Sequence, residues 1–300
     1  MVQDMDWVAR VNRAIDLVLE TRDAPRDLAE VARAVHSSPY HFHRVFRSVV
    51  GETLHSFQKR VRLERALHLM AHSPRMQLTD VALATGFADS SSFSKAFKAQ
   101  YGSAPSRFDL DGWRAARRDQ LNMPGSGLHF ERLPPGQNPD GFRVVEQLLP
   151  ARAFATLRVP NPFQPGRVTG AFETLVAWAE ARDLADGAWF GWMWEDPTLV
   201  PLEQCRYDAA VEVPADTPVD EGVTLQRFGP MRVARLTVEG DILLEQRALD
   251  WLYGTWLPRS GYEPAPLPCF EAWHGRPFAH GVEHFALDLH LPIVGGPGGR

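Results

Sequence analysis

Cysteine is scarce in this chain of 300 residues, which contains only Cys205 and Cys269. Two thiols cannot build a disulfide scaffold or a four-thiolate zinc site, which fits a protein of the reducing cytoplasm. No apolar run approaches the ~18 residues that a membrane helix needs, and two acids precede the first base, so neither a membrane span nor a secretory signal is expected. The G-x-S-x-G, G-x-x-x-x-G-K-[ST] and H-E-x-x-H signatures are also missing, which argues against the enzyme classes that depend on them.

Charge is unevenly distributed along the chain. Residues 1–120 hold 18 Lys and Arg against 14 Asp and Glu, whereas residues 121–300 hold 14 against 23. The net charge of −5 is therefore the sum of a basic first part and an acidic remainder. This asymmetry favours a polyanion-binding module that is linked to a domain with a different function.

The composition changes between residues 119 and 141, where Pro124-Gly125-Ser126-Gly127 and Pro134-Pro135-Gly136 break both helical and strand patterns. We expect a linker there, between an all-α domain over residues 6–118 and an α+β domain over residues 142–294. In the second domain, two helical patterns interrupt short alternating segments. The predicted helices are Val168–Arg182 and Asp241–Leu257, and the predicted strands are Phe142–Leu149, Arg152–Val159, Tyr207–Val213, Met231–Val238 and His284–Leu291.

The first domain contains an internal repeat at an offset of 50 to 51 residues. In each copy a Leu-x-x-Val-Ala motif is followed by two phenylalanines four residues apart. Rings at positions i and i+4 share one helix face, so we expect both to point into a core. The matching residues are Leu28-x-x-Val31-Ala32 with Phe42 and Phe46, and Leu78-x-x-Val81-Ala82 with Phe93 and Phe97.

Each copy is predicted to form a short helix, a tight turn and a second, basic helix. Ser38 followed by Pro39 begins the second helix of the first copy, and Asp89 begins that of the second copy. Asp27-x-x-Glu30 has the spacing of a capping box before the first short helix. This order is the helix-turn-helix pattern, whose second helix enters the major groove of DNA.

The segment from Thr53 to Ala71 joins the two copies and contains no Gly or Pro. Its 19 residues predict a helix of about 28 Å with an apolar stripe. Such a spacer can hold two recognition helices about one turn of DNA apart, ~34 Å, on one face of the duplex. One chain would then do what dimeric repressors do with two.

The second copy carries the run Gly86-Phe87-x-Asp89-x-Ser91-x-Phe93-x-x-x-Phe97-Lys98-x-x-x-Gly102-x-x-Pro105-Ser106-x-Phe108. This run resembles the signature of the AraC/XylS family of bacterial transcription regulators. The resemblance covers residues 6–118 and extends to Ser38-Pro39-Tyr40-x-Phe42-x-Arg44-x-Phe46 in the first copy. It implies that the two units bind two adjacent major grooves of double-stranded DNA and that RNA polymerase is a further partner.

The candidate DNA contacts lie opposite the phenylalanine rings. Arg44 is the foremost candidate for base reading, because a guanidinium can pair with guanine in a bidentate way that is worth about 1–3 kcal/mol. The second helix presents mainly serines, which bind many partners, so we expect the first copy to read sequence and the second to hold the backbone. Arg47, Lys98 and Arg107 fit either phosphate contacts or solvated surface. The candidates are Ser38, Tyr40, His43, Arg44 and Arg47 in the first copy, and Ser90, Ser91, Ser94, Lys95 and Lys98 in the second.

Tryptophan is concentrated in the acidic part, where eight of the nine lie beyond residue 112. A well-packed core is the simplest explanation for such rings. Glu271, however, is a single acid bracketed by Cys269-Phe270 and Ala272-Trp273. A carboxylate among aromatic rings can attract a cation by Coulomb and cation–π forces together. A solvated strand edge is the alternative for this residue.

The acidic part also resembles a GyrI-like (gyrase-inhibitor-like) small-molecule-binding domain over residues 142–294. The runs that carry the resemblance are Gly191-x-x-x-Glu195-Asp196-Pro197, Cys205-Arg206-Tyr207-Asp208, Trp251-Leu252-x-x-x-Trp256-Leu257 and Pro268-x-Phe270-Glu271-x-Trp273. The resemblance implies a pocket for amphipathic, often cationic aromatic compounds around a central glutamate, whose position is Glu271 here. The candidate ligand-binding residues are Trp192, Trp194, Trp251, Tyr253, Phe270, Glu271 and Trp273.

Together the two resemblances predict a Rob-type, cytoplasmic transcription regulator whose activity responds to a small hydrophobic effector, cationic or neutral. No catalytic residue, cofactor or metal is expected. His280-x-x-x-His284 has a zinc-like spacing but lacks a third ligand. Two alternatives stay open: a GyrI-like hydrolase tethered to DNA, and a constitutive DNA-binding protein without a small-molecule ligand.

Overall fold

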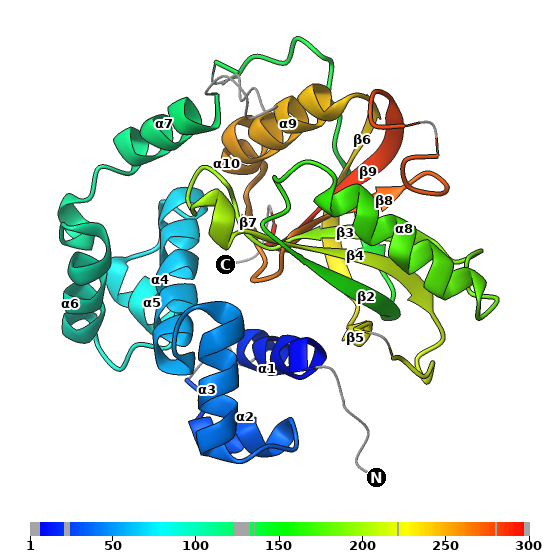
Figure 1. The fold of residues 1–300 in the computed structure, drawn as a ribbon. Coiled ribbons are helices and arrows are strands. Elements are labelled where there is room, and N and C mark those ends of the chain that lie inside the picture. Colours follow the sequence, from blue (N-terminus) through cyan, green and yellow to red (C-terminus); the bar gives the residue numbers. More distant parts are fainter. Residues whose placement is uncertain are drawn as a thin grey trace. The chain divides into compact units, whose positions relative to one another are not determined.

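The computed structural model of this protein describes residues 7–20, 25–122, 133–134, 136–220, 222–279 and 281–296 (Figure 1). The chain divides into two compact units between Asp111 and Gly112. Residues 123–132 and 135 of the predicted linker, and His280 of the zinc-like pair, lie outside the described residues. In the described part, no helix has the length and apolar character that crossing a membrane requires.

The first unit is all α, as predicted from the helical periodicity. Two helix-turn-helix units follow α1 and are joined by α4, and a short 3₁₀ turn follows the second of them (Figure 1). The elements are α1 (Trp7–Glu20), α2 (Leu28–Ala34), α3 (Pro39–Val50), α4 (Leu54–His72), α5 (Leu78–Ala84), α6 (Ser90–Tyr101) and η1 (Pro105–Arg107).

The second helices of the two units, α3 and α6, begin at the residues that the sequence predicts. The Ser38 hydroxyl accepts a hydrogen bond from the His41 N–H at 3.3 Å, one turn into α3. The Asp89 carboxylate accepts one from the Ser92 N–H at 2.6 Å at the same position of α6. These bonds satisfy backbone donors that have no partner inside the helix, which fixes where each helix starts.

The capping box predicted before α2 is only half formed. The Asp27 carboxylate accepts the Ala29 N–H at 2.9 Å, as expected. The Glu30 carboxylate pairs with the Arg26 guanidinium instead of reaching back to the cap, because a charged donor is a stronger partner than a backbone N–H.

Helix α4 contributes to the cores of both helix-turn-helix units. Leu54 and Phe57 pack with the phenylalanine rings of α3 in the first core. Leu63, Ala66 and Leu67 pack with the phenylalanine rings of α6 in the second. A single helix therefore carries both units on its two ends, as the apolar stripe predicts.

Polar side chains of α4 form hydrogen bonds with two backbone segments, one that precedes α2 and one in the turn between α5 and α6. Gln58 accepts the N–H of Arg26 at 2.6 Å and donates to the carbonyl of the same residue at 3.0 Å. Arg62 donates to the carbonyls of Thr85 and Gly86 in the turn between α5 and α6. These partly buried contacts replace water as the partner of backbone groups that no helix satisfies.

Helix α7 (Leu110–Leu121) begins at the boundary between the units. Residues after Asp111 contact other parts of the second unit. The Trp113 indole donates to the carbonyl of Leu199 at 3.1 Å, and Arg118 pairs with Asp250 at 3.6 Å. The last residue of the helix, Leu121, is buried.

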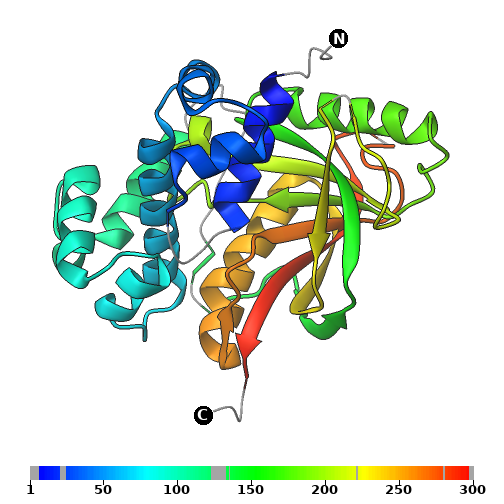
Figure 2. The same cartoon turned by 90° about the horizontal axis from the view of Figure 1, so that it is seen from below.

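The second unit is an antiparallel sheet with helices, the α+β class that the sequence predicts. The sheet order is β1-β6-β9-β8-β3-β4-β2-β5, and β7 pairs with β9. The twist of the sheet is seen in Figure 2. The strands are β1 (Val145–Leu149), β2 (Arg152–Pro160), β3 (Trp189–Met193), β4 (Arg206–Val213), β5 (Thr224–Phe228), β6 (Met231–Gly240), β7 (Tyr262–Pro264), β8 (Cys269–Trp273) and β9 (Phe285–Gly295).

The sheet consists of two similar halves that meet between β8 and β3. In each half a strand leads into a helix and returns as two adjacent strands: β2, α8, β3 and β4 in the first, and β6, α9, β8 and β9 in the second. The strand that precedes each half in the sequence pairs with the other half, since β1 pairs with β6 and β5 pairs with β2. The helical elements of this unit are α8 (Arg167–Glu180), η2 (Leu202–Gln204), α9 (Ile242–Trp251), the π-helical turn η3 (Leu252–Trp256) and α10 (Leu257–Ser260).

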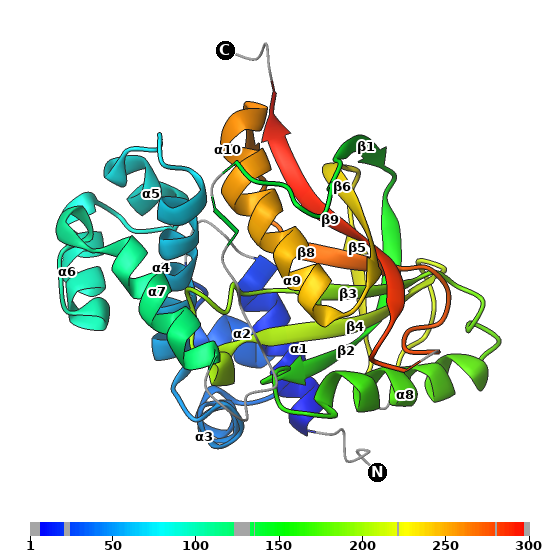
Figure 3. The ribbon, with the colours of Figure 1, turned by 90° about the horizontal axis from the view of Figure 1, so that it is seen from above.

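Helices α8 and α9 cover one face of this sheet (Figure 3). Phe172 and Trp178 of α8, and Ala248 and Trp251 of α9, are buried in one cluster with the inward residues of the strands. We call this the helix-covered face. The opposite face carries a second cluster around Phe154, and we call it the open-side face.

Candidate DNA-binding surface and effector site

The candidate contacts on α3 form one exposed stripe. Ser38, Tyr40, Arg44 and Arg47 are exposed, and His43 is half-buried. Tyr40 has 74% of its surface exposed, which is unusual for a large ring. The Arg44 guanidinium lies 5.8 Å from the centre of that ring and donates to its hydroxyl at 3.4 Å. The Tyr40 and Arg44 side chains are therefore in contact on the exposed surface of the helix.

The candidate DNA contacts on α6 are three small serine side chains and two lysines. Ser90, Ser91, Lys95 and Lys98 are exposed, and Ser94 is half-buried. Two lysines and small hydroxyls suit contacts to phosphates, which need charge and reach but no base geometry.

An acid stands at the start of this helix. The hydrogen bonds from Ser92 lower the pKa of Asp89, and the positive charge of Lys95 contributes to the same shift. The carboxylate is thus ionised next to the serines, and it offers an acceptor rather than a phosphate contact.

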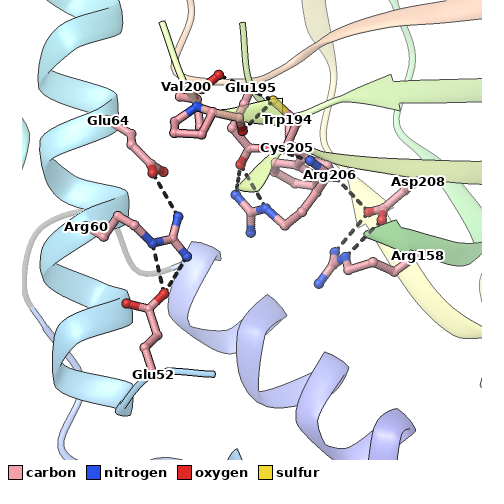
Figure 4. Close-up of polar contacts among 11 residues, drawn as sticks. Glu52, Arg60, Glu64, Arg158, Trp194, Glu195, Val200, Cys205, Arg206 and Asp208 are labelled. Atoms are coloured by element: carbon pink, nitrogen blue, oxygen red, sulfur yellow. Dashed lines mark hydrogen bonds and ion pairs between the residues drawn. The ribbon is translucent and has the colours of Figure 1, made fainter. Parts of the chain in front are cut away.

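Arg60 of α4 is basic but is not available for phosphate (Figure 4). Its guanidinium donates to Glu52 at 2.9 and 2.7 Å and to Glu64 at 2.8 Å. Burial works against its charge, but Glu64 and Glu52 outweigh burial and raise its pKa. The basic count of this unit therefore overstates the charge that faces solvent.

Glu271 is buried in the helix-covered face, at the seam of the two halves of the sheet. It stands on β8 opposite Gly191 of β3, and only 6% of its surface is exposed. Its Oε2 accepts hydrogen bonds from the Tyr207 hydroxyl at 2.6 Å and from the Trp273 indole at 3.0 Å. The solvated strand edge that the sequence left open is therefore not its environment.

The absence of a side chain at Gly191 makes room for this arrangement. A Cβ atom built on Gly191 would lie 1.7 Å from the Tyr207 hydroxyl and 2.5 Å from Glu271 Oε2. The glycine thus lets the tyrosine cross from β4 to β8, over the strand between them.

The sequence did not single out Glu245, which is a second acid at this position. It comes from α9, is 4% exposed, and lies close enough to Glu271 for their charges to interact. Burial raises the pKa of Glu271 to about 7, against the effect of the hydrogen bonds from Tyr207 and Trp273. Burial and the charge of Glu271 raise the pKa of Glu245 well above its ordinary value.

Two patterns in the sequence could have identified Glu245 and Tyr207. Glu245 falls in the apolar stripe of its helix with Ala248, Leu249 and Leu252, at spacings of three, four and seven. Tyr207 alternates with the buried residues of β4 that face α8. A polar residue at a buried position of either pattern is a candidate for the site.

The aromatic candidates divide between the two faces. Trp273 and Trp251 belong to the helix-covered cluster with the site, and Tyr253 lies beside Cys269 on the same face. Trp192 and Phe270 belong to the open-side cluster, where their rings are 4.2 Å apart. The structure therefore does not bring Trp192 and Phe270 together with Glu271.

Trp194, the remaining candidate, lies in a polar network on the open side (Figure 4). Its indole donates at 2.8 Å to Asp208, a fully buried carboxylate that also accepts two bonds of 2.9 Å from Arg158. Burial alone would raise the pKa of Asp208, but Arg158 and Trp194 outweigh burial and lower it. Arg206 lies 5.8 Å from the Trp194 ring and is held by Glu195. Trp194 thus has a partner within the fold.

No group of His, Cys, Asp and Glu among the described residues is arranged to hold a metal ion. His290, the buried histidine of the open side, stacks on Phe270 at 4.8 Å. Burial lowers the pKa of His290 to about 4, so its ring is neutral at pH 7.

Two family descriptions match the chain, one for each unit. The description of a helix-turn-helix domain matches residues 31–110. The description of the GyrI-like small molecule binding domain matches residues 144–294, which is half of the chain.

Curated relatives match the two parts separately. The bifunctional transcriptional activator/DNA repair enzyme AdaA of Bacillus subtilis is 30% identical over 105 residues, 35% of this chain. This chain spans about half (48%) of the length of that relative. The DNA gyrase inhibitor of Escherichia coli K12 is 30% identical over 150 residues, which cover 48% of this chain and 90% of the inhibitor.

Among solved structures, the EcmrR C-terminal domain covers 51% of this chain with 98% of its own, at 12% identity and a TM-score of 0.40. The half-chain match and the gyrase-inhibitor relative show the family of the second unit. The chain belongs to the GyrI-like small-molecule-binding family and carries a helix-turn-helix domain of the AraC/XylS type ahead of that domain.

Proposed function

We propose that this protein is a sequence-specific DNA-binding transcription regulator whose activity is modulated by a small molecule in its GyrI-like domain. The observation that carries the proposal is the duplicated helix-turn-helix unit on one helix, α4, in a chain that also holds a small-molecule-binding domain. Regulation at a bacterial promoter places its work in the cytoplasm, with RNA polymerase as a partner.

On DNA, α3 reads bases and α6 holds the backbone. The support is the difference between the two stripes, since α3 offers an outward arginine beside a tyrosine and α6 offers lysines among serines. Arg44 pairs with a guanine, and the loss of a bidentate pair costs about 1–3 kcal/mol of discrimination. Lys95 contacts a phosphate, so its loss weakens all sequences alike.

The DNA test is selection of bound sequences from a random pool, followed by affinity measurements on the selected site and on single-base variants of it. Arg44→Ala is expected to relax the preference at one position. Lys95→Ala is expected to lower affinity uniformly and to reduce the salt slope by about one. Equal, sequence-independent losses for both variants would refute the division between α3 and α6.

The effector binds at the seam of the two sheet halves, at Glu271. The support is a buried carboxyl with aromatic neighbours that lacks a cationic partner among the described residues. A hydrophobic cation satisfies that carboxyl by its charge and the rings by its body. Trp273, Trp251 and Tyr253 line the site, whereas Trp192, Trp194 and Phe270 act in folding rather than in binding.

A ligand regulates only if it binds the DNA-competent and the incompetent states with different affinity. The test is a titration of tryptophan fluorescence with cationic dyes, with and without the selected DNA. Quenching that depends on Glu271, and a dye affinity that DNA changes, are the expected results. Quenching that Glu271→Gln leaves unchanged would remove Glu271 from the ligand site.

A further inference from the structure

A cavity of about 220 Å³ lies beside α4 in the first unit, and none of its lining residues is a candidate contact on α3 or α6. Its walls come from the segment before α2, from the first half of α4, and from the turn between α5 and α6. It therefore lies where the two helix-turn-helix units meet. We call it the α4 groove; its described lining residues are Pro25, His55, Gln58, Lys59, Arg62 and Phe87.

The α4 groove is lined by bases, and no acid stands among its described lining residues. His55, Lys59 and Arg62 follow the spacing i, i+4 and i+7, which places them on one face of the helix. His55 is exposed and Lys59 is half-buried, and neither forms an ion pair with a residue that the structure describes. Arg60 of the same helix differs, because two glutamates take its donors. The positive charge of the groove is thus not balanced from within the described chain.

Arg62 is held in place without being neutralised. Its Nε donates to the Thr85 carbonyl at 2.8 Å, its Nη2 donates to the Gly86 carbonyl, and its guanidinium carbon lies 3.9 Å from the centre of the Phe87 ring. Its Nη1 has no hydrogen bond to the described chain. Burial lowers the pKa of Arg62, and no described acid opposes this effect. A half-buried charge with a fixed, unused donor favours an anion as its partner, and little side-chain entropy remains to be lost on binding.

The donors of the groove suit a phosphate group. An imidazole, an ammonium and a guanidinium reach the cavity from three successive turns of α4. A planar carboxylate offers two oxygens in one plane, whereas a phosphate group offers oxygens in several directions. Separate donors around one cavity therefore match a phosphate better than a carboxylate.

The position of the groove indicates where that phosphate comes from. Phe87 stands three residues before Ser90, where α6 begins, and the N-terminal residues of a recognition helix are those that reach the bases. Two adjacent major grooves are separated by a minor groove that the phosphate backbones border. A cavity on the helix that spaces the two recognition helices is thus placed to meet the backbone between the two half-sites.

We propose that the α4 groove binds a phosphate group of the DNA backbone between the two half-sites, with Lys59 and Arg62 as its charged donors and His55 at its rim. This inference rests on the proposed DNA-binding function and adds a contact outside both recognition helices. Because the walls of the groove belong to both sides of the first unit, the bound phosphate fixes the two helix-turn-helix units on one stretch of duplex. A free phosphate offers the same oxygens, and the test separates the two sources.

The test uses the full chain and the DNA site selected from the random pool. Each backbone phosphate between the half-sites is replaced in turn by an uncharged methylphosphonate, and affinity is measured at fixed salt. Lys59→Gln is the test variant, because it removes the charge and keeps a polar side chain, whereas Arg62 also holds the turn before α6. Arg13→Gln, at an exposed position of α1, removes the same charge outside the groove and is the matched control.

We expect one position between the half-sites at which the methylphosphonate weakens wild-type binding about tenfold but hardly changes the binding of Lys59→Gln. On the unmodified site, Lys59→Gln is expected to bind about tenfold more weakly and to reduce the salt slope by about one. The loss should be the same for all sequences, because a phosphate carries no base identity. Arg13→Gln is expected to behave as wild type, and urea unfolding curves establish that each variant is folded.

Equal losses for wild type and Lys59→Gln at every substituted position overturn the DNA phosphate. Inorganic phosphate, titrated at constant ionic strength without DNA, separates the other source. Phosphate binding that Lys59→Gln removes, with unchanged DNA affinity, assigns the groove to a free phosphate and overturns its role on DNA. If no DNA site is selected, the proposed function and this contact fail together. If a site is selected and Lys59→Gln binds it as wild type does, only the contact fails.

Discussion

Gly191→Ala is a sharp test of the geometry at the seam of the sheet. The added Cβ would lie 1.7 Å from the Tyr207 hydroxyl and 2.5 Å from Glu271 Oε2. Heavy atoms that are not bonded to each other do not come so close, so either Tyr207 must move or β3 must separate from its neighbouring strands. Gly191 does not occupy the left-handed region, so space alone decides the outcome.

The cost follows from the two ways in which the site can respond. Overpacking a close-packed core costs about 1–3 kcal/mol. Displacing Tyr207 breaks its 2.6 Å bond to Glu271, and a buried acceptor left with one donor fewer costs about 1–3 kcal/mol more. We expect a loss of about 2–6 kcal/mol, a large part of the stability of an ordinary domain.

Urea unfolding followed by tryptophan fluorescence measures this loss, because eight of the nine tryptophans lie beyond residue 112. With ordinary urea slopes the midpoint should fall by about 1–3 M. The control is Gly170→Ala in α8, where a Cβ meets nothing within 4 Å. That variant should gain about 0.5–1 kcal/mol from its helix propensity. A Gly191→Ala midpoint equal to that of wild type would refute the position of the tyrosine over the glycine.

Three further predictions concern Glu271, a buried ion pair and a turn. The pKa of Glu271 is about 7 in the folded chain against 4.5 when the residue is exposed, so the folded state keeps a proton that the unfolded state loses. The free energy of unfolding should therefore fall by roughly 3 kcal/mol between pH 4.5 and 7. Unfolding curves of Glu271→Gln should show a weaker dependence on pH over this range. Arg158→Leu leaves the charge of Asp208 buried without its partner and should lower the free energy of unfolding by about 3–5 kcal/mol. Adding Asp208→Leu should recover part of this loss. An unchanged urea midpoint for Arg158→Leu would refute the pairing. Arg62→Ala leaves two carbonyls without their donor and should cost about 1–3 kcal/mol in thermal unfolding of the first unit, whereas the exposed Arg33→Ala should be neutral.

Local chemistry decides most of the first unit. Ser38 and Asp89 cap α3 and α6 at the predicted places, since a cap depends on a side chain and a backbone N–H only three residues apart. The helix from Leu54 to His72 forms where the sequence has no Gly or Pro. The repeated phenylalanine pairs are buried as their spacing predicts. Each of these signals lies within one or two helical turns, so it can be read without the fold.

The proposed effector site could not be derived from such local signals, because the pleat of a sheet sends successive residues to opposite faces. Phe270 and Glu271 are neighbours in sequence, yet one joins the open-side cluster and the other the helix-covered face. The prediction that Trp192 and Phe270 surround Glu271 rested on their sequence context, but the sheet places these two rings on the face opposite to Glu271. Only the order of the strands, which pairs Gly191 with Glu271, shows which rings share a face with the acid.

The chain alone determined two DNA-binding helical units on a shared spacer, an α+β second domain, and one acid among aromatic rings. It determined them because caps, helical stripes and alternation act between residues that are near in sequence. The tertiary structure decided that Tyr207 of β4 would reach Glu271 of β8 across the seam, and that Glu245 of α9, 26 positions before Glu271, would be buried near it. These contacts depend on the order of the strands and on where the helices pack. Both are set by the burial of whole apolar faces rather than by any local sequence pattern.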